Sequence, residues 1–223
     1  MFLLNRRIYD AKNPKESKII LRIHQIRVIQ VLIAYLCNTK LHKMETTLIK
    51  DILIAESLIR DVPDFPRPGI IFKDITPVLA NPQAMREVID RFIEFAMPKK
   101  PDAIVGIESR GFVFGMPLAL EMRLPFIPVR KLGKLPYRCI HEEYALEYGA
   151  NTVEMHEDAI SPGDRIIIVD DLLATGGTAS AAKRLVNRLG GTVEGFAFLM
   201  ELSFLHGRLA LDQDDILALI TAE

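Results

Sequence analysis

The segment RIIIVDDLLATGGTASAA, at residues 165–182, decides the predicted fold. Four branched apolar residues follow Arg165, and this composition predicts a buried β-strand over 165–169. Asp170 and Asp171 come next, then a turn of small residues, and apolar residues return with helical spacing over 179–189. A strand that leads through a glycine-rich turn into a helix is typical of parallel α/β sheets.

The turn has the composition of a phosphate site. The N-terminus of a helix offers free N–H groups and a positive dipole end, and glycine lets the backbone approach a ligand closely. Asp170 and Asp171 repel phosphate but can accept hydrogen bonds from nearby sugar hydroxyls, so the pattern predicts a ribose 5-phosphate site. An acidic turn before an ordinary N-cap is the alternative. The predicted phosphate-binding residues are Ala174, Thr175, Gly176, Gly177 and Thr178.

Strand and helix patterns alternate through most of the chain. Further strands are predicted over 103–107, 124–130, 151–156, 190–201 and 216–220, and helices over 46–61, 83–96 and 112–122. A Pro-rich stretch at 61–82 predicts a shaped loop with short extended pieces, and 131–149 predicts a long loop. The alternation predicts one α/β domain: a mostly parallel, twisted sheet flanked by helices.

The first 43 residues differ in charge from the rest of the chain. They carry nine Lys or Arg and two acidic residues, a net charge of +7, whereas the whole chain has −1. The apolar run at 28–39 is too short to span a bilayer, and no secretory signal is evident. An organelle presequence or a surface-binding helix is compatible with this composition. We expect a basic, poorly ordered or non-native extension over 1–43, with Met44 as the working start.

Overall charge and cysteine content bound the function. A net charge of −1 argues against a chain that binds nucleic acid as a whole. The two cysteines, Cys37 and Cys139, form no metal or disulfide pattern, so we expect a reducing, cytoplasmic location. We also expect no membrane association. Neither a G-K-[ST] phosphate loop nor a GxGxxG fingerprint occurs.

The segment 166–179 resembles the phosphoribosyl-pyrophosphate motif of the type I phosphoribosyltransferases. VPDFPRPGIIFKDITPVL (62–79), ESRGFVFG (108–115), RKLGKLP (130–136) and YALEYG (144–149) resemble its adenine-specific branch, over nearly all of 45–205. The resemblance implies the type I fold with a small N-terminal hood, over 44–223. It implies a homodimeric purine-salvage enzyme that uses Mg²⁺ and converts adenine and phosphoribosyl pyrophosphate to AMP and pyrophosphate. The extension 1–43 has no counterpart in typical short members.

The resemblance assigns the sugar and pyrophosphate contacts. Asp170 and Asp171 hold the ribose hydroxyls and the Mg²⁺ shell, largely through substrate and water, and residues 174–178 bind the 5-phosphate. Ser109 and Arg110 form the pyrophosphate loop, with a cis peptide expected between Glu108 and Ser109. Arg110 also counts as catalytic, because cations stabilise the leaving pyrophosphate beside an oxocarbenium-like transition state. Further pyrophosphate contacts, some from the partner subunit, are assigned to Arg130, Lys131 and Lys134.

The resemblance also assigns the base and its proton. Phe72 lies beside adenine, Ile71 and Lys73 read the base edge through backbone groups, and Leu172 lines the opposite wall. Glu147 is the expected general acid/base, because adenine loses a proton as N9 attacks. Tyr148 closes over the site as part of a lid.

Alternatives remain at the level of the sequence. Phe72 could be an ordinary core aromatic, Lys131 part of a solvated charge run, and Glu147 a solvent-facing loop residue. A phosphoribosyltransferase for another purine base is a second alternative, but the Pro-rich entry segment favours adenine. A phosphoribosyl-pyrophosphate-sensing regulator with a DNA-binding basic head is a third, although no helix-turn-helix pattern is readable there.

Overall fold

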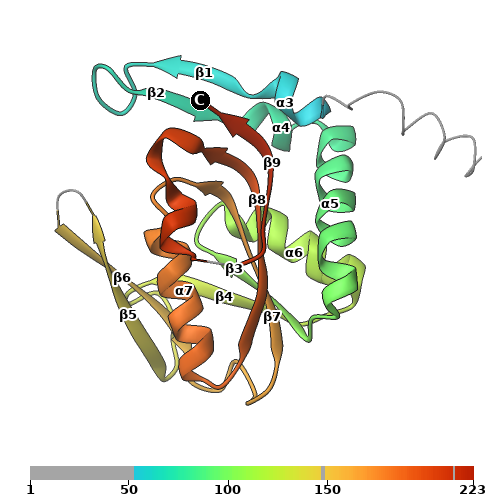
Figure 1. Ribbon diagram of the computed structural model, residues 1–223, viewed down its shortest axis with the longest axis vertical. Helices are drawn as coiled ribbons and strands as arrows, with labels where there is room; N and C mark the ends of the chain where they lie inside the picture. The colour runs from blue at the N-terminus through green and yellow to red at the C-terminus, as the bar shows by residue number, and fades with distance from the viewer. Residues whose placement is uncertain (1–52, 147–148, 213) are drawn as a thin grey trace, which may run out of the picture. The chain divides into compact units, whose positions relative to one another are not determined.

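The computed structural model describes residues 53–146, 149–212 and 214–223 (Figure 1). The predicted extension 1–43 and the proposed start at Met44 lie outside these residues. Among the described residues, none of the helices combines the length and apolarity that crossing a lipid bilayer requires.

A seven-stranded sheet forms the centre of the described fold, with strand order β5-β6-β4-β3-β7-β8-β9. β3, β4, β7, β8 and β9 run parallel, whereas β6 pairs antiparallel with β4 and β5. The predicted mostly parallel sheet is therefore confirmed. The strands are β3 (Ala103–Ile107), β4 (Phe126–Lys131), β5 (Cys139–Leu146), β6 (Gly149–His156), β7 (Arg165–Leu173), β8 (Thr192–Leu202) and β9 (Ile216–Ala222).

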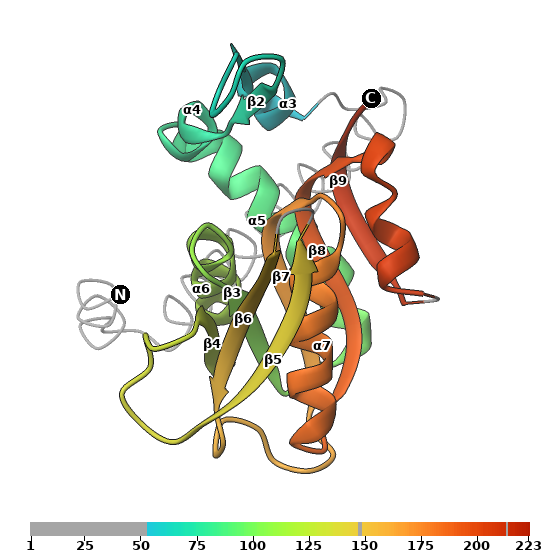
Figure 2. The same cartoon turned by 90° about the vertical axis from the view of Figure 1, so that its left-hand side faces the viewer.

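Helices cover both faces of this sheet (Figure 2). α5 (Pro82–Ala96) and α6 (Gly111–Met122) pack with Ile167 and Val169 of β7 in one buried cluster. α7 (Gly177–Arg188) packs with the alternate residues Ile166 and Ile168 in a second cluster. Successive strand side chains point to opposite faces, so the unbroken apolar run in β7 supplies both cores.

Local signals position α5 and α6. The Asn81 side chain accepts hydrogen bonds from the N–H groups of Gln83 and Ala84, both at 3.0 Å, and so caps α5. α6 crosses β3 where two glycines face each other: a Cβ on Gly106 or Gly115 would come within 2.6 or 2.9 Å of the Phe126 ring. This close crossing fixes the start of α6 directly after the end of β3.

A two-stranded antiparallel sheet forms the predicted hood, from β1 (Arg60–Pro63) and β2 (Ile71–Asp74). Arg60 pairs with Asp74 at 2.5 Å, and Lys73 pairs with Asp61 at 2.7 Å. The helix predicted over 46–61 is wrong at its end, because α3 (Ile54–Leu58) stops before these cross-strand pairs begin. Short helices follow at α4 (Thr76–Leu79) and η1 (Met97–Lys99).

The long loop predicted over 131–149 is also wrong, because Cys139–Leu146 forms β5 and pairs with β6 at all eight positions. Ile140 and Tyr144 pack against the α7 cluster, but Glu142 between them interrupts the apolar alternation. Its carboxylate binds Arg184 at 2.8 Å and Arg188 at 2.7 Å on α7. Glu142, whose charge made this segment look like a loop in the sequence, therefore joins β5 to α7.

The remaining boundaries differ by a few residues. β7 continues through Asp170 and Asp171 to Leu173 because β8 pairs with it along that length. α7 begins at Gly177, two residues before the predicted start, after Gly176 in a left-handed conformation with φ +79°. Two 3₁₀ turns, η2 (Ser203–Leu205) and η3 (Gly207–Ala210), connect β8 to β9.

Candidate active site

A cavity of about 510 Å³ lies at the carboxyl ends of β3, β4 and β7. This is the edge at which open parallel sheets bind ligands. Its lining is mostly polar and charged, unlike the apolar lining of most small-molecule pockets. The lining residues are Ile107, Glu108, Ser109, Arg110, Lys131, Lys134, Tyr144, Asn151, Asp170, Asp171, Leu172 and Thr178.

A smaller pocket of about 70 Å³ lies around the turn between β7 and α7. It shares Asp170, Leu172 and Thr178 with the larger cavity, so the two spaces adjoin. Its remaining lining consists of Leu173, Ala174, Thr175, Gly176, Gly177 and Ala179. All five predicted phosphate-binding residues therefore surround one small space at the N-terminus of a helix.

Two carboxylates lie together where these spaces meet. Burial and the neighbouring Asp171 charge raise the pKa of Asp170 well above its ordinary value. Burial also raises the pKa of Asp171, whose exposure is only 5%, and the Arg110 guanidinium opposes that rise at 3.0 Å. Asp170 accepts a hydrogen bond from the Asp171 N–H at 2.8 Å. The pair is electrostatically unfavourable, and hydroxyl donors or a cation would relieve it.

Arg110 connects the cavity to the hood. Its guanidinium carbon lies 5.6 Å from the centre of the Phe72 ring, while its Nε contacts Asp171. Phe72 in turn meets Phe65 edge-to-face at 5.2 Å. One arginine thus links the acidic end of β7 with the aromatic residue predicted to lie beside adenine.

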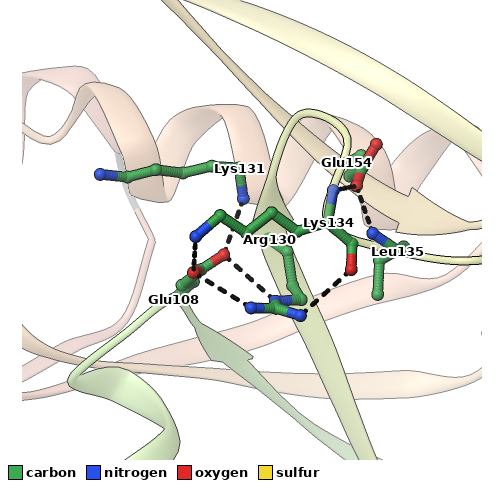
Figure 3. Close-up of polar contacts among 6 residues, drawn as sticks. All are labelled: Glu108, Arg130, Lys131, Lys134, Leu135 and Glu154. Atoms are coloured by element: carbon green, nitrogen blue, oxygen red, sulfur yellow. Dashed lines mark hydrogen bonds and ion pairs between the residues drawn. The ribbon is translucent and has the colours of Figure 1, made fainter.

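Glu108 gathers the basic residues at the end of β4 and just after it (Figure 3). It accepts hydrogen bonds from Arg130 at 3.1 and 3.2 Å, from the Lys131 N–H at 3.1 Å and from Lys134 Nζ at 3.1 Å. Burial alone would raise the pKa of Glu108, but these donors outweigh it and lower the pKa to about 2. The carboxylate is therefore ionised at neutral pH.

Glu154 holds the same basic segment from the other side (Figure 3). This residue of β6 is 3% exposed, and one of its oxygens accepts the N–H groups of Lys134 and Leu135, both at 2.8 Å. Glu108 thus holds the Arg130 and Lys134 side chains and the Lys131 N–H, and Glu154 holds the backbone at Lys134 and Leu135.

The structure brings most predicted site residues together, but not all. Ser109, Arg110, Lys131, Lys134 and Leu172 line the larger cavity, and the peptide between Glu108 and Ser109 is cis, as predicted. Arg130 is not among the lining residues of either pocket described above, because its guanidinium binds Glu108 and the Lys134 carbonyl. Ile71 and Lys73 stay on the hood strand β2, outside both linings. Glu147 and Tyr148 lie outside the described residues.

Four cavity residues escaped the sequence analysis: Ile107, Glu108, Tyr144 and Asn151. Glu108 directly precedes the predicted pyrophosphate loop at the end of a strand, so its position was a usable signal. Tyr144 and Asn151 are opposite each other in the β5–β6 register. Because β5 was predicted as a loop, the sequence offered no reason to place these two side chains together.

The donor set is compatible with a magnesium ion. Carboxylate oxygens are the protein ligands that Mg²⁺ prefers, and such sites often use one or two carboxylates plus substrate phosphates and water. Within the described ranges, no group of three or more His, Cys, Asp or Glu side chains is placed to hold a metal on its own. Asp170 and Asp171 therefore fit an ion that takes its other ligands from substrate and water.

Comparisons with known proteins agree with this geometry. Residues 75–215 match the model of the phosphoribosyl transferase domain. The adenine phosphoribosyltransferase of Synechococcus sp. is 54% identical over 166 residues, which cover 74% of this chain and 97% of that relative. The enzyme of the same name from Myxococcus xanthus is 51% identical over 177 residues, or 79% and 95% of the two chains.

Solved structures give the same result. The crystal structure of adenine phosphoribosyltransferase from Thermoanaerobacter pseudethanolicus superposes with a TM-score of 0.73 at 49% identity, over 75% of this chain and 98% of that one. The Saccharomyces cerevisiae enzyme, complexed with adenine and an imino-altritol bisphosphate, gives a TM-score of 0.70 at 43% identity, over 74% and 95%. The predicted type I phosphoribosyltransferase fold is confirmed.

Substitution of Asp170 by Asn is expected to stabilise the free protein at neutral pH. A folded-state pKa above the ordinary 3.8 means that ionisation of Asp170 destabilises the folded chain as pH rises above that value. Removing the charge should raise the melting temperature at pH 7.5 by roughly 2–4 °C, about 1 kcal/mol for a chain of this size. The gain should disappear as the pH falls toward 4, where the wild-type carboxyl is neutral.

A matched control lies at the other end of β7. The Asp102 carboxylate accepts hydrogen bonds from the N–H of Arg165 at 2.9 Å and from its Nε at 3.0 Å, and these bonds lower the pKa of Asp102 to about 2. Asp102→Asn should therefore destabilise the protein at neutral pH. Thermal unfolding across pH 4–8 measures both variants. A lower melting temperature for Asp170→Asn at pH 7.5 would contradict the unfavourable pairing.

Substitution of Glu108 by Gln is expected to act with the opposite sign. A pKa lowered from 4.5 to about 2 stabilises the folded chain above pH 4.5, and this stabilisation is lost as pH falls through 2. Glu108→Gln should lower the free energy of unfolding at pH 7 by about 1 kcal/mol, after solvent screening, and by less near pH 3. Denaturant titration measures this difference. The exposed Glu157, 3.7 Å from Arg138, gives the control Glu157→Gln, for which an equal loss would argue against a special role of Glu108.

Proposed function

The chain belongs to the adenine phosphoribosyltransferase family, and we propose that it transfers the 5-phosphoribosyl group of phosphoribosyl pyrophosphate to adenine. The products are AMP and pyrophosphate, which places the reaction in purine salvage. The observation that carries the proposal is the junction of two spaces: a phosphate-sized pocket at the start of α7 and a cation-lined cavity, with two carboxylates between them.

The two spaces suit the two ends of phosphoribosyl pyrophosphate. The 5-phosphate enters the pocket formed by residues 174–178, where backbone N–H groups and the helix dipole favour an anion. The ribose hydroxyls donate to Asp170 and Asp171. Since these carboxylates have raised pKa values in the free protein, hydroxyl donors favour their ionised forms and gain binding energy from a strained pair.

The cationic side of the cavity suits the leaving group. Bond cleavage at ribose C1 leaves positive charge on the ring and negative charge on pyrophosphate. Ser109, Arg110, Lys131 and Lys134 line the space where that negative charge develops, and preorganised cations stabilise it. When bound, Mg²⁺ would neutralise further charge on the pyrophosphate oxygens, with Asp170 and Asp171 as its protein contacts. Arg130 supports this wall through Glu108.

The base binds on the hood side of the cavity. Support comes from Phe72, which Arg110 connects to the acidic end of β7, and from Leu172, which lines the cavity. Ile71 and Lys73 remain the proposed backbone readers of the adenine edge. Glu147 is the proposed acid/base for the adenine proton, and Tyr148 the proposed closing residue. In the sequence they follow β5, and Tyr144 of β5 and Asn151 of β6 line the cavity.

A homodimer in the cytoplasm completes the proposal. Val113, Met116 and Leu120 form an exposed apolar stripe along α6, with Leu120 75% exposed, and such stripes often mark protein interfaces. α6 begins next to Arg110, so a partner on this stripe would border the cavity. The proposed catalytic domain covers 44–223, and the segment 1–43 lies outside it: 166 residues of this chain match 97% of the Synechococcus relative.

Turnover of adenine and phosphoribosyl pyrophosphate tests the function. We expect AMP formation with the purified full chain, loss of activity with EDTA and recovery with excess Mg²⁺. Adenine should be preferred over hypoxanthine, because a backbone reader distinguishes a 6-amino from a 6-oxo group by hydrogen-bond polarity. Arg110→Ala should lower kcat by on the order of 10²-fold or more, whereas Arg86→Ala, at an exposed position of α5, should leave kcat unchanged. Absence of AMP formation, together with salt-sensitive DNA binding, would favour the regulator alternative.

Substitution of Glu147 by Gln tests the proposed proton carrier. A lost general acid/base lowers kcat by roughly 10²–10⁴-fold, with little change in the KM of phosphoribosyl pyrophosphate. Glu143→Gln, four residues earlier on an exposed position of β5, is the matched control and should retain wild-type kcat. Steady-state kinetics measures both variants. A Glu147→Gln enzyme with near wild-type turnover would contradict the assignment.

A further inference from the structure

The phosphate loop, residues 174–178, packs against a segment far along the chain, Ser203–Leu211, which follows β8 (drawn in red in Figure 1). Two glycines form the contact. A Cβ on Gly207 would lie 2.2 Å from the Ala174 carbonyl oxygen, and a Cβ on Gly176 would lie 2.4 Å from the Gly207 carbonyl oxygen. Real Cβ atoms essentially never come within 3.0 Å of such atoms, so neither position has room for a side chain.

The requirement at Gly207 comes from space alone. Gly176 needs glycine for its backbone as well, since its φ is +79°, but Gly207 has no left-handed φ. Gly207 is buried, and its missing side chain would also meet the Leu173 side chain at 3.0 Å. Glycine is therefore required at position 207 by the close packing of this segment against the phosphate loop, and not by the backbone conformation of Gly207 itself.

The segment is attached firmly enough to act as a wall. Leu211 is 1% exposed and belongs to the core cluster of α7. Lys183 of α7 contacts Asp214 at 2.6 Å, and Arg208 contacts the buried Glu201 of β8 at 2.7 Å. Contacts from α7 and β8 thus hold this segment within its length and just beyond its end.

We propose that Gly207 is a positioning residue of the 5-phosphate site: the segment Ser203–Leu211 supports the phosphate loop from behind and sets the direction of its N–H groups. The pocket of about 70 Å³ is lined by this same loop, and no residue of Ser203–Leu211 is among its lining residues. A side chain at position 207 would displace the Ala174 carbonyl, and with it the following loop residues that line the pocket. This inference rests on the proposed role of residues 174–178 in binding phosphate.

The test is Gly207→Ala in the full chain, with Gly191→Ala as the matched control. A Cβ on Gly191 would also be crowded, at 2.9 Å from Ile160 and 3.0 Å from Val186, but its contacts lie at the far end of α7. Gly207→Ala should raise the KM of phosphoribosyl pyrophosphate and the dissociation constant of ribose 5-phosphate on the order of tenfold or more, since misplacement near 1 Å can be this costly. The KM of adenine at saturating phosphoribosyl pyrophosphate should stay unchanged. Gly191→Ala should lower thermal stability without this split.

Hydrogen exchange of the amides at 175–179 provides a readout that does not depend on turnover. Exchange should increase in Gly207→Ala and stay at the wild-type rate in Gly191→Ala. If the wild-type protein makes no AMP, the proposed function is wrong. The exchange rates then still test whether Gly207 positions the loop at 174–178. Unchanged exchange and unchanged ribose 5-phosphate binding in Gly207→Ala would overturn the inference. If Gly207→Ala does not fold, Asp214→Asn replaces it, because this change weakens the contact of Asp214 with Lys183. Asp214→Asn should raise the KM of phosphoribosyl pyrophosphate about 2–3-fold, and no increase would overturn the inference.

Discussion

The electrostatic cost of placing Asp170 and Asp171 side by side at the end of a buried strand shapes the rest of the site. Burial raises the pKa of both carboxyls, and the Asp171 charge raises the pKa of Asp170 further. Arg110 lies 3.0 Å from Asp171 and offsets part of this cost. Both pKa values stay raised, so the ionised pair destabilises the ligand-free protein. Sugar hydroxyls and a cation, which are proposed to bind at this point, would offset that destabilisation.

Arg110 can serve this pair only because the fold fixes its position closely. It directly precedes α6, and α6 crosses β3 at Gly106 and Gly115, with the Phe126 ring filling the remaining space. β3 and β7 are hydrogen-bonded neighbours, so the end of one strand delivers Arg110 and the end of the other delivers the carboxylates. Packing between β3, β4 and α6, next to the cavity lining, thereby determines a charge–charge distance within the cavity.

The sequence predicted the parts of the fold that depend on neighbouring residues. The apolar run of β7, the glycine turn and the following helix are local, and so is the cis peptide before Ser109 once the family resemblance is known. The sequence failed where a residue acts through a distant partner. β5 was missed because Glu142 looks like a loop residue until Arg184 and Arg188 of α7 are beside it. Arg130 stays a predicted pyrophosphate ligand, but the sequence did not predict that Glu108 pairs with it across 22 residues.

The same distinction separates the two ends of the site. On the proposed pyrophosphate side, charged side chains do the positioning: Glu108 and Glu154 hold the basic residues by hydrogen bonds that depend on ionised carboxylates. On the proposed 5-phosphate side, shape does it, because Gly176 and Gly207 meet backbone to backbone where no side chain fits. Cations paired with a carboxylate can exchange that anion for another, which suits the group that is proposed to leave. A rigid backbone contact offers no such exchange, and it suits the phosphate that is proposed to stay bound from substrate to product.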